Sequence, residues 1–142
     1  MFLIFAVGCA GLFAGAALYV SLVEHPARLA CGTEVAARQF APSYARGAVM
    51  QASLAILGLA AGVCAWYVSR DLWVLIGSLL LGSLVPYTLI VMLPLNKLIL
   101  KPPADATPAE KMRSLNRWGR LHAVRSAAGV TALIVLLLRL AA

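Results

Sequence analysis

Apolar residues fall into four long runs along this chain, and short polar breaks separate the runs. The helices predicted from these runs cover about residues 2–25, 43–69, 72–100 and 108–140. Each run is longer than the roughly 20 residues that a helix needs to cross the hydrocarbon core of a bilayer. The pattern therefore predicts an all-α protein, a four-helix transmembrane bundle, in which residues 1–142 form a single integral membrane domain.

The polar breaks carry signals for where the helices begin and end. Residues 27–46 are expected to form the first loop, with Pro42 near the start of the second helix. Residues 101–106 read KPPADA and break the chain after the third helix. Thr107–Glu110 then forms a capping box with proline at the first helical position. Because about three polar turns precede the last apolar run, the fourth helix is expected to extend into the cytoplasm.

Composition and charge support a multi-pass membrane protein. Apolar residues make up 63% of the chain and charged residues 12%, whereas a soluble domain is about half apolar and a quarter charged. The net charge is +7, with nine Lys and Arg residues in or beside the first and third loops and only Arg70 and Arg139 on the opposite side. By the positive-inside rule, both basic loops face the cytoplasm and both termini face outward, in the inner membrane if the source is a bacterium. The charge thus indicates topology and not nucleic-acid binding.

Polar side chains within the membrane segments gather at the predicted cytoplasmic ends of the helices. They are Glu24 and His25 in the first helix, Tyr44 and Gln51 in the second, Asn96 in the third, and Trp118, His122 and Arg125 in the fourth. At about 100° per residue, the last three share one face of their helix. Such groups are costly in a bilayer unless they are paired or hydrated. We therefore expect His25, Asn96, His122 and Arg125 to point into one cavity, with Trp118 on its wall.

Three short motifs resemble the anthrone oxygenase-like family of small four-helix membrane proteins. They are AGAALYVSLVEHPA at Ala14–Ala27, PLNKL at Pro94–Leu98 and WGRLHAVR at Trp118–Arg125. The W-x-x-x-H-x-x-R spacing in the third motif is the most distinctive. The resemblance implies an oxygenase that converts an anthrone to an anthraquinone without a bound cofactor, with a site formed by Asn96, Trp118, His122 and Arg125.

This chemistry needs a base that removes an acidic C–H proton and a cation that holds the resulting oxyanion. The imidazole of His122 suits the first role and the guanidinium of Arg125 suits the second. Trp118 would stack on a planar, hydrophobic substrate. Asn96 and His25 are grouped with the catalytic residues, and Glu24, Tyr44 and Gln51 are grouped with Trp118 as substrate-binding residues.

Other functions stay open at the level of the sequence. One is a non-enzymatic membrane protein that binds a lipid or a small molecule, or that serves as an accessory subunit. Another is a metal-dependent oxygenase with Glu24, His25 and His122 as ligands, although no HxxxH or ExxH spacing is present. No metal or cofactor is therefore expected. Glycine-rich helix faces are also compatible with a homo-oligomer.

Overall fold

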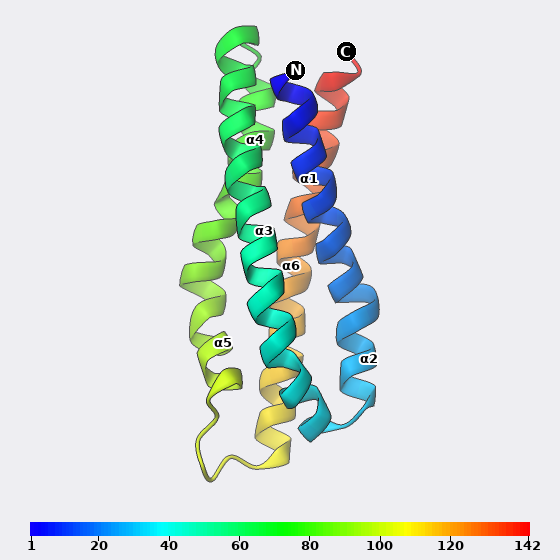
Figure 1. Cartoon of the computed structure of the whole chain (residues 1–142), viewed down its shortest axis with the longest axis vertical. Coiled ribbons are helices and arrows are strands. Elements are labelled where there is room, and N and C mark those ends of the chain that lie inside the picture. Colours follow the sequence, from blue (N-terminus) through cyan, green and yellow to red (C-terminus); the bar gives the residue numbers. More distant parts are fainter.

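The computed structural model describes residues 1–142 and contains no strand. Its helices join end to end into four long rods, which cover Phe2–Ala30, Thr33–Ser69, Leu72–Leu100 and Pro108–Leu140. In chain order the elements are α1 (Phe2–Tyr19), η1 (Val20–Glu24), α2 (His25–Ala30), α3 (Thr33–Ser69), α4 (Leu72–Tyr87), η2 (Thr88–Met92), α5 (Leu93–Leu100) and α6 (Pro108–Leu140). Both termini lie at one end of the bundle, and the loop between α5 and α6 lies at the other (Figure 1). All four rods are long and apolar enough to cross a membrane. The predicted fold class, a four-helix transmembrane bundle, is confirmed.

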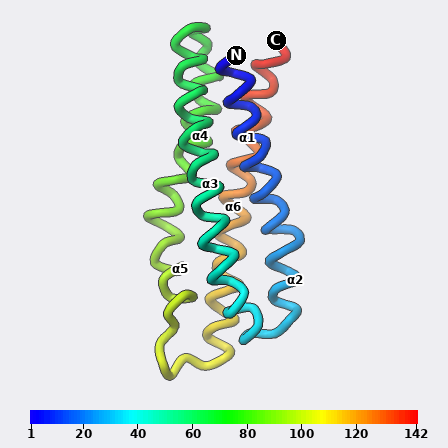
Figure 2. The backbone as a smooth tube through the Cα atoms, in the orientation of Figure 1, coloured from blue at the N-terminus to red at the C-terminus, as the bar shows by residue number.

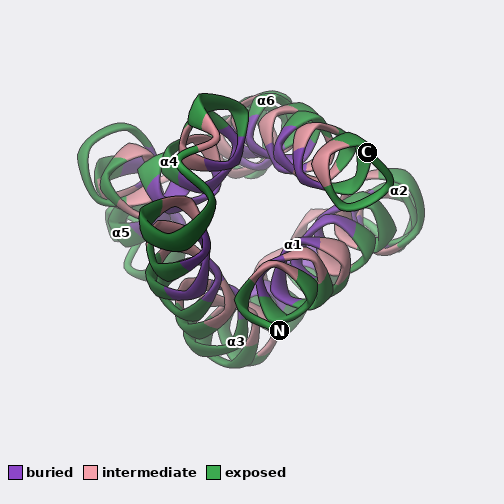
Figure 3. Cartoon of the chain, turned by 90° about the horizontal axis from the view of Figure 1, so that it is seen from above, coloured by how far each residue is buried: buried purple, intermediate pink, exposed green.

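The rods form a closed ring around a shared core. Helix α1 packs against α3 and α6, and α4 packs against the same two helices on the other side. Figure 3 shows this ring from above, with buried residues facing the centre. Small side chains let the rods approach closely. A Cβ at Gly62 would lie 1.8 Å from Ser78 Oγ, so this glycine face of α3 packs against α4 within the same chain.

The first and third rods share an unusual feature, because each contains a π-helix followed by a proline. Element η1 ends two residues before Pro26, and η2 ends two residues before Pro94. Proline has no N–H to donate and its ring crowds the preceding turn, which a wider helical turn relieves. Both rods therefore continue through their prolines, and in Figure 2 they spread apart toward the end that carries α2 and α5.

The predicted first loop, residues 27–46, is wrong because most of it is helical. Helix α2 continues to Ala30, α3 begins at Thr33, and Pro42 lies inside α3. Tertiary packing stabilises these extra turns: Phe40 is fully buried in a second core formed with residues of η2, α5 and α6. The local signal of a proline was overridden by this packing, which the sequence pattern does not reveal.

The start of α6 agrees with its predicted capping box. The backbone N–H of Glu110 donates to Thr107 Oγ1 (3.3 Å), and the backbone N–H of Thr107 donates to Glu110 Oε2 (2.8 Å). Further along α6, Trp118, His122 and Arg125 are buried on one face, as the helical periodicity predicts.

Charged residues mark the edges of an apolar band around the bundle. At the end with the termini these charges are Arg70, Asp71 and Arg139, and Arg139 Nε donates to Asp71 Oδ2 (2.6 Å). At the other end, Arg120 on α6 is exposed and lies 19 positions before Arg139. At 1.5 Å per residue this interval spans about 28 Å, close to the thickness of a hydrocarbon core. The chain is thus a multi-pass membrane protein.

Candidate functional site

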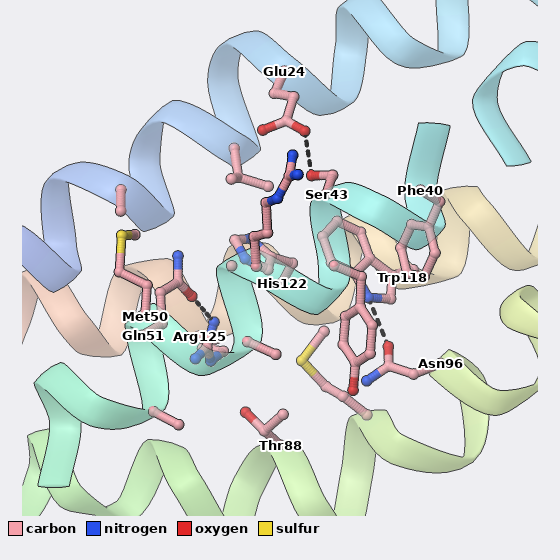
Figure 4. A pocket seen from close by; sticks show the side chains of 18 of the residues that line it. Glu24, Phe40, Ser43, Met50, Gln51, Thr88, Asn96, Trp118, His122 and Arg125 are labelled. Atoms are coloured by element: carbon pink, nitrogen blue, oxygen red, sulfur yellow. Dashed lines mark hydrogen bonds between the residues drawn. The ribbon is translucent and has the colours of Figure 1, made fainter. Parts of the chain in front are cut away.

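A cavity of about 460 Å³ opens between the rods, toward the end of the bundle that carries α2 and α5. Its walls come from α1, η1, α2, α3, α4, η2, α5 and α6. The predicted site residues on these walls are Glu24, Tyr44, Gln51, Asn96, Trp118, His122 and Arg125. Figure 4 shows most of these side chains around the shared space. The structure therefore brings together seven of the eight residues predicted from the sequence, from all four rods.

The cavity exists because α3 separates from the two π-helices. Helix α3 packs along α1 and α4 and again touches α2 and α5, but it makes no comparable contact with η1 or η2. Gly47 lies on this stretch of α3 and lines the cavity, and no atom lies within 4 Å of the position where its Cβ would be. The absence of a side chain at Gly47 and the separation of α3 from η1 and η2 leave the space open.

His25 is the exception among the predicted site residues. It does not line the cavity but packs behind Trp118, with ring centroids 5.1 Å apart, and a Cβ on Gly119 would lie 2.6 Å from His25 Nε2. The predicted position of His25 in the cavity is therefore wrong. The physical reason is the π-helix before it, whose wider turn rotates the residues that follow to a different face.

The His122 imidazole is held on one side by two hydroxyl groups. Its Nδ1 lies 3.0 Å from Ser21 Oγ and 3.4 Å from Ser126 Oγ, and the two hydroxyl oxygens are 2.8 Å apart. Ser126 Oγ also lies within hydrogen-bond distance, 3.0 Å, of the carbonyl oxygen of Ala17. No protein group hydrogen-bonds to Nε2 of His122, and the residue lines the cavity. The two hydroxyl groups thus orient the ring through Nδ1, and Nε2 remains available to a ligand in the cavity.

Arg125 lies about one turn after His122 and is only 7% exposed. Its Nη1 donates to Gln51 Oε1 on α3, and its guanidinium lies over the ring of Phe13, with Cζ 4.8 Å from the ring centroid. Its Nε is buried and has no hydrogen-bond partner. A guanidinium with donors to spare therefore faces the cavity beside the imidazole.

Trp118 connects the cavity to the second core. Its Nε1 donates to Asn96 Oδ1 (2.9 Å), and its ring stacks on His122 with centroids 4.7 Å apart and planes inclined by 24°. Phe40 meets the same indole edge-on at 5.2 Å. Asn96 is 1% exposed, and its Nδ2 has no partner. The aromatic wall is consequently rigid and held by a buried hydrogen bond.

Sequence reasoning missed Arg28, which was assigned to the first loop. Arg28 lines the cavity, is 5% exposed, and donates from Nη2 to Glu24 Oε1 (2.6 Å). The same carboxylate oxygen accepts from Ser43 Oγ (2.5 Å) and from Gln39 Nε2 (3.0 Å). The i, i+4 spacing of Glu24 and Arg28 is the signal that would have found the pair, provided that the helix was continued through Pro26. Ser21 and Ser126 were missed as well, since only the tertiary structure brings Ser21 to His122.

The alternative metal ligands Glu24, His25 and His122 do not form a metal-binding cluster. No group of three or more His, Cys, Asp and Glu side chains lies close enough together to hold a metal ion. The donors that do face the cavity are N–H groups and hydroxyls, which suit an oxygen-bearing organic ligand better than a cation.

Fold and site together define a multi-pass membrane protein with a polar-ended, aromatic-walled cavity near one membrane surface. The family model described as anthrone oxygenase matches residues 40–135, which is more than half of the chain. The chain belongs to this family. The matched range contains Gln51, Asn96, Trp118, His122 and Arg125 and excludes Glu24 and His25. No curated protein and no solved structure matches the chain.

Proposed function

We propose that this protein is a membrane-embedded oxygenase that oxidises a planar, apolar aromatic molecule of the anthrone or quinone type. The observation that carries the proposal is the pairing of His122 and Arg125 on one face of α6. The imidazole presents an unengaged Nε2, and the guanidinium one turn away has unused N–H donors. Both groups border a cavity with aromatic walls, whose volume lies within the range typical of small-molecule sites.

The serine pair supports a base role for His122. If Ser126 donates to the carbonyl of Ala17, its oxygen accepts from Ser21, whose own oxygen then accepts from His122 Nδ1–H. This order of protons leaves Nε2 as the unprotonated nitrogen facing the cavity. Ser21 and Ser126 thus act as positioning residues in the proposed mechanism.

The proposed reaction converts an activated CH2 group between aromatic rings to a carbonyl. His122 Nε2 removes one C–H proton, and the resulting enolate oxygen is stabilised by Arg125. The enolate carbon transfers its electrons to dioxygen and forms a C–O bond, and the proton returned from His122 completes a hydroperoxide. Loss of water from this hydroperoxide gives the carbonyl, so that CH2 and O2 become C=O and H2O.

The remaining residues bind and orient the substrate in this proposal. Trp118 and Tyr44 offer ring faces or edges to a flat molecule, and Asn96 offers an amide N–H to one of its oxygens. The ion pair of Glu24 and Arg28 closes the wall on the side of α2. We assign His25 to the support of Trp118 and not to contact with the substrate.

The proposal is tested with anthrone and the purified protein in nanodiscs, by measuring anthraquinone formation and oxygen uptake. The wild type should exceed the spontaneous rate in empty nanodiscs, and His122→Ala should lower its rate about 100-fold or more. Arg125→Lys should also impair turnover, because an ammonium does not reproduce the guanidinium fork. Asn116→Ala, on the exposed face of α6, is the matched control and should behave as wild type.

A wild-type rate equal to that of empty nanodiscs would contradict the oxygenase proposal for this substrate. Saturable binding of anthrone without turnover would instead support the second candidate function, a non-enzymatic membrane protein that binds a small molecule. The same cavity serves both functions, and its walls alone favour binding of an apolar aromatic ligand.

A further inference from the structure

Arg125 is a buried cation without an anionic partner in this protein. The chain has five acidic residues, and each is accounted for elsewhere. Glu24 pairs with Arg28, Glu34 with Lys111 and Asp71 with Arg139, while Glu110 belongs to the capping box and Asp105 lies exposed in the loop before α6. No carboxylate is therefore left for the guanidinium inside the apolar band.

The groups that do contact Arg125 are neutral. Gln51 accepts one hydrogen bond, and Phe13 offers the face of its ring. A cation–π contact and a neutral hydrogen bond are weaker than a charge-assisted hydrogen bond to an anion. A charge held away from water is costly when it lacks such a partner.

The unpartnered atoms around the cavity point to the same kind of ligand. Three buried side-chain atoms on the cavity residues have no hydrogen-bond partner, namely Arg28 Nη1, Asn96 Nδ2 and Arg125 Nε. All three are N–H donors, and the unpaired acceptor on the cavity wall, His122 Nε2 in the proposed tautomer, is the proposed base. The complementary ligand brings oxygen acceptors and at least one negative charge.

We infer that the cavity binds its ligand as an anion, an aromatic carboxylate or phenolate whose charged oxygen accepts hydrogen bonds from Arg125. The aromatic part is indicated by the rings that line the space, among them Trp118, Tyr44 and Phe40. The inference rests on the proposed function only for the location of the ligand. In the proposed reaction Arg125 stabilises the enolate intermediate, whereas in this inference it also binds the ligand before any reaction. The inference therefore concerns binding, whether or not turnover follows.

The test measures binding alone, in nanodiscs of neutral phosphatidylcholine, so it stays separate from any assay of oxygenation. The probes are anthracene-9-carboxylate and its uncharged isostere anthracene-9-carboxamide. The carboxylate should bind about tenfold more tightly or better, because a charge-assisted hydrogen bond is roughly twice as strong as a neutral one. Equal affinities would overturn the inference, because they would show that the cavity does not recognise the negative charge of the ligand.

Variants at Gln51 sharpen the test without removing Arg125. Gln51→Glu places a carboxylate against the guanidinium and should abolish the preference for the charged probe. Gln51→Leu leaves the guanidinium uncompensated and should keep the preference. If Gln51→Glu retains the wild-type preference, Arg125 is not the anion site and the inference fails.

Removal of the guanidinium provides an independent arm. Arg125→Gln should bind both anthracene probes equally, whereas the matched control Arg139→Gln, which removes a guanidinium at the opposite end of the bundle, should keep the wild-type preference. Because Arg125→Gln could fail to fold, the Gln51 variants carry the test in that event.

Decanoate is the last probe, and it tests the aromatic part of the inference. An affinity equal to that of anthracene-9-carboxylate would overturn that part in favour of a fatty acid.

Discussion

Arg28 and Asn96 occupy corresponding positions in the first and third rods, each two residues after a proline that follows a π-helix. Both border Trp118 of α6: Arg28 Cζ lies 5.8 Å from the centroid of the indole ring, and Asn96 accepts from its Nε1. The first and third rods therefore bring polar groups to the same residue of α6. The residues that follow the two π-helices thus help to form the cavity wall.

Filling the cavity at Gly47 should block ligand binding while leaving the fold intact. Gly47→Leu adds a side chain where no atom lies within 4 Å of the new Cβ, so it should not lower thermal stability. The leucine would occupy part of the cavity, and the affinity for anthracene-9-carboxylate should fall about tenfold or more, each tenfold being about 1.4 kcal/mol. Gly15→Leu is the matched control, since Gly15 also has open space but does not line the cavity. Unchanged affinity in Gly47→Leu would mean that the ligand binds elsewhere.

The buried hydrogen bond between Trp118 and Asn96 should contribute to stability. Asn96→Leu leaves the indole N–H without a partner, and the free energy of unfolding should fall by about 1–3 kcal/mol. Adding Trp118→Phe, which removes the orphaned donor, should make the loss at position 96 smaller than it is in the wild-type background. Thermal unfolding in one detergent measures both effects, with Asn116→Leu as the exposed control. Additive losses in the double variant would show that the two side chains are not coupled.

Ser21 should influence turnover through His122 without touching the substrate. Ser21→Ala removes the acceptor of His122 Nδ1–H, so the proposed tautomer loses its support and turnover should fall about tenfold or more. The pH dependence of the rate should shift at the same time, which a purely structural role would not cause. Ser83→Ala removes an exposed hydroxyl that bonds only to its own helix and is the control. If Ser21→Ala changed stability but neither the rate nor its pH profile, the positioning role would be contradicted.

The orientation in the membrane remains a prediction that reporter fusions can test. Fusions at Ala104 should report the cytoplasmic side, and fusions at the C-terminus should report the outer side, because the basic residues gather at the end that carries α2 and α5. Introducing two lysines next to Arg70 provides a control that weakens the charge asymmetry. The opposite reporter pattern would move the cavity mouth to the outer surface and leave its residues unchanged.

The apolar pattern was sufficient to predict four spanning helices, because each rod satisfies its own backbone hydrogen bonds and must be apolar to lie in lipid. The periodicity of α6 likewise predicted that Trp118, His122 and Arg125 share a buried face. These features depend on residues within a few turns of one another.

Only the tertiary structure decided which groups from different rods meet. The contact of Ser21 with His122 and the bond of Gln51 to Arg125 join residues far apart in sequence. The π-helix before Pro26 shifted the face of the residues that follow, so that His25 packs behind Trp118 instead of lining the cavity, whereas Arg28 lines it. Such a shift follows from how a proline is accommodated against neighbouring helices, and a repeat counted along one helix cannot contain that information.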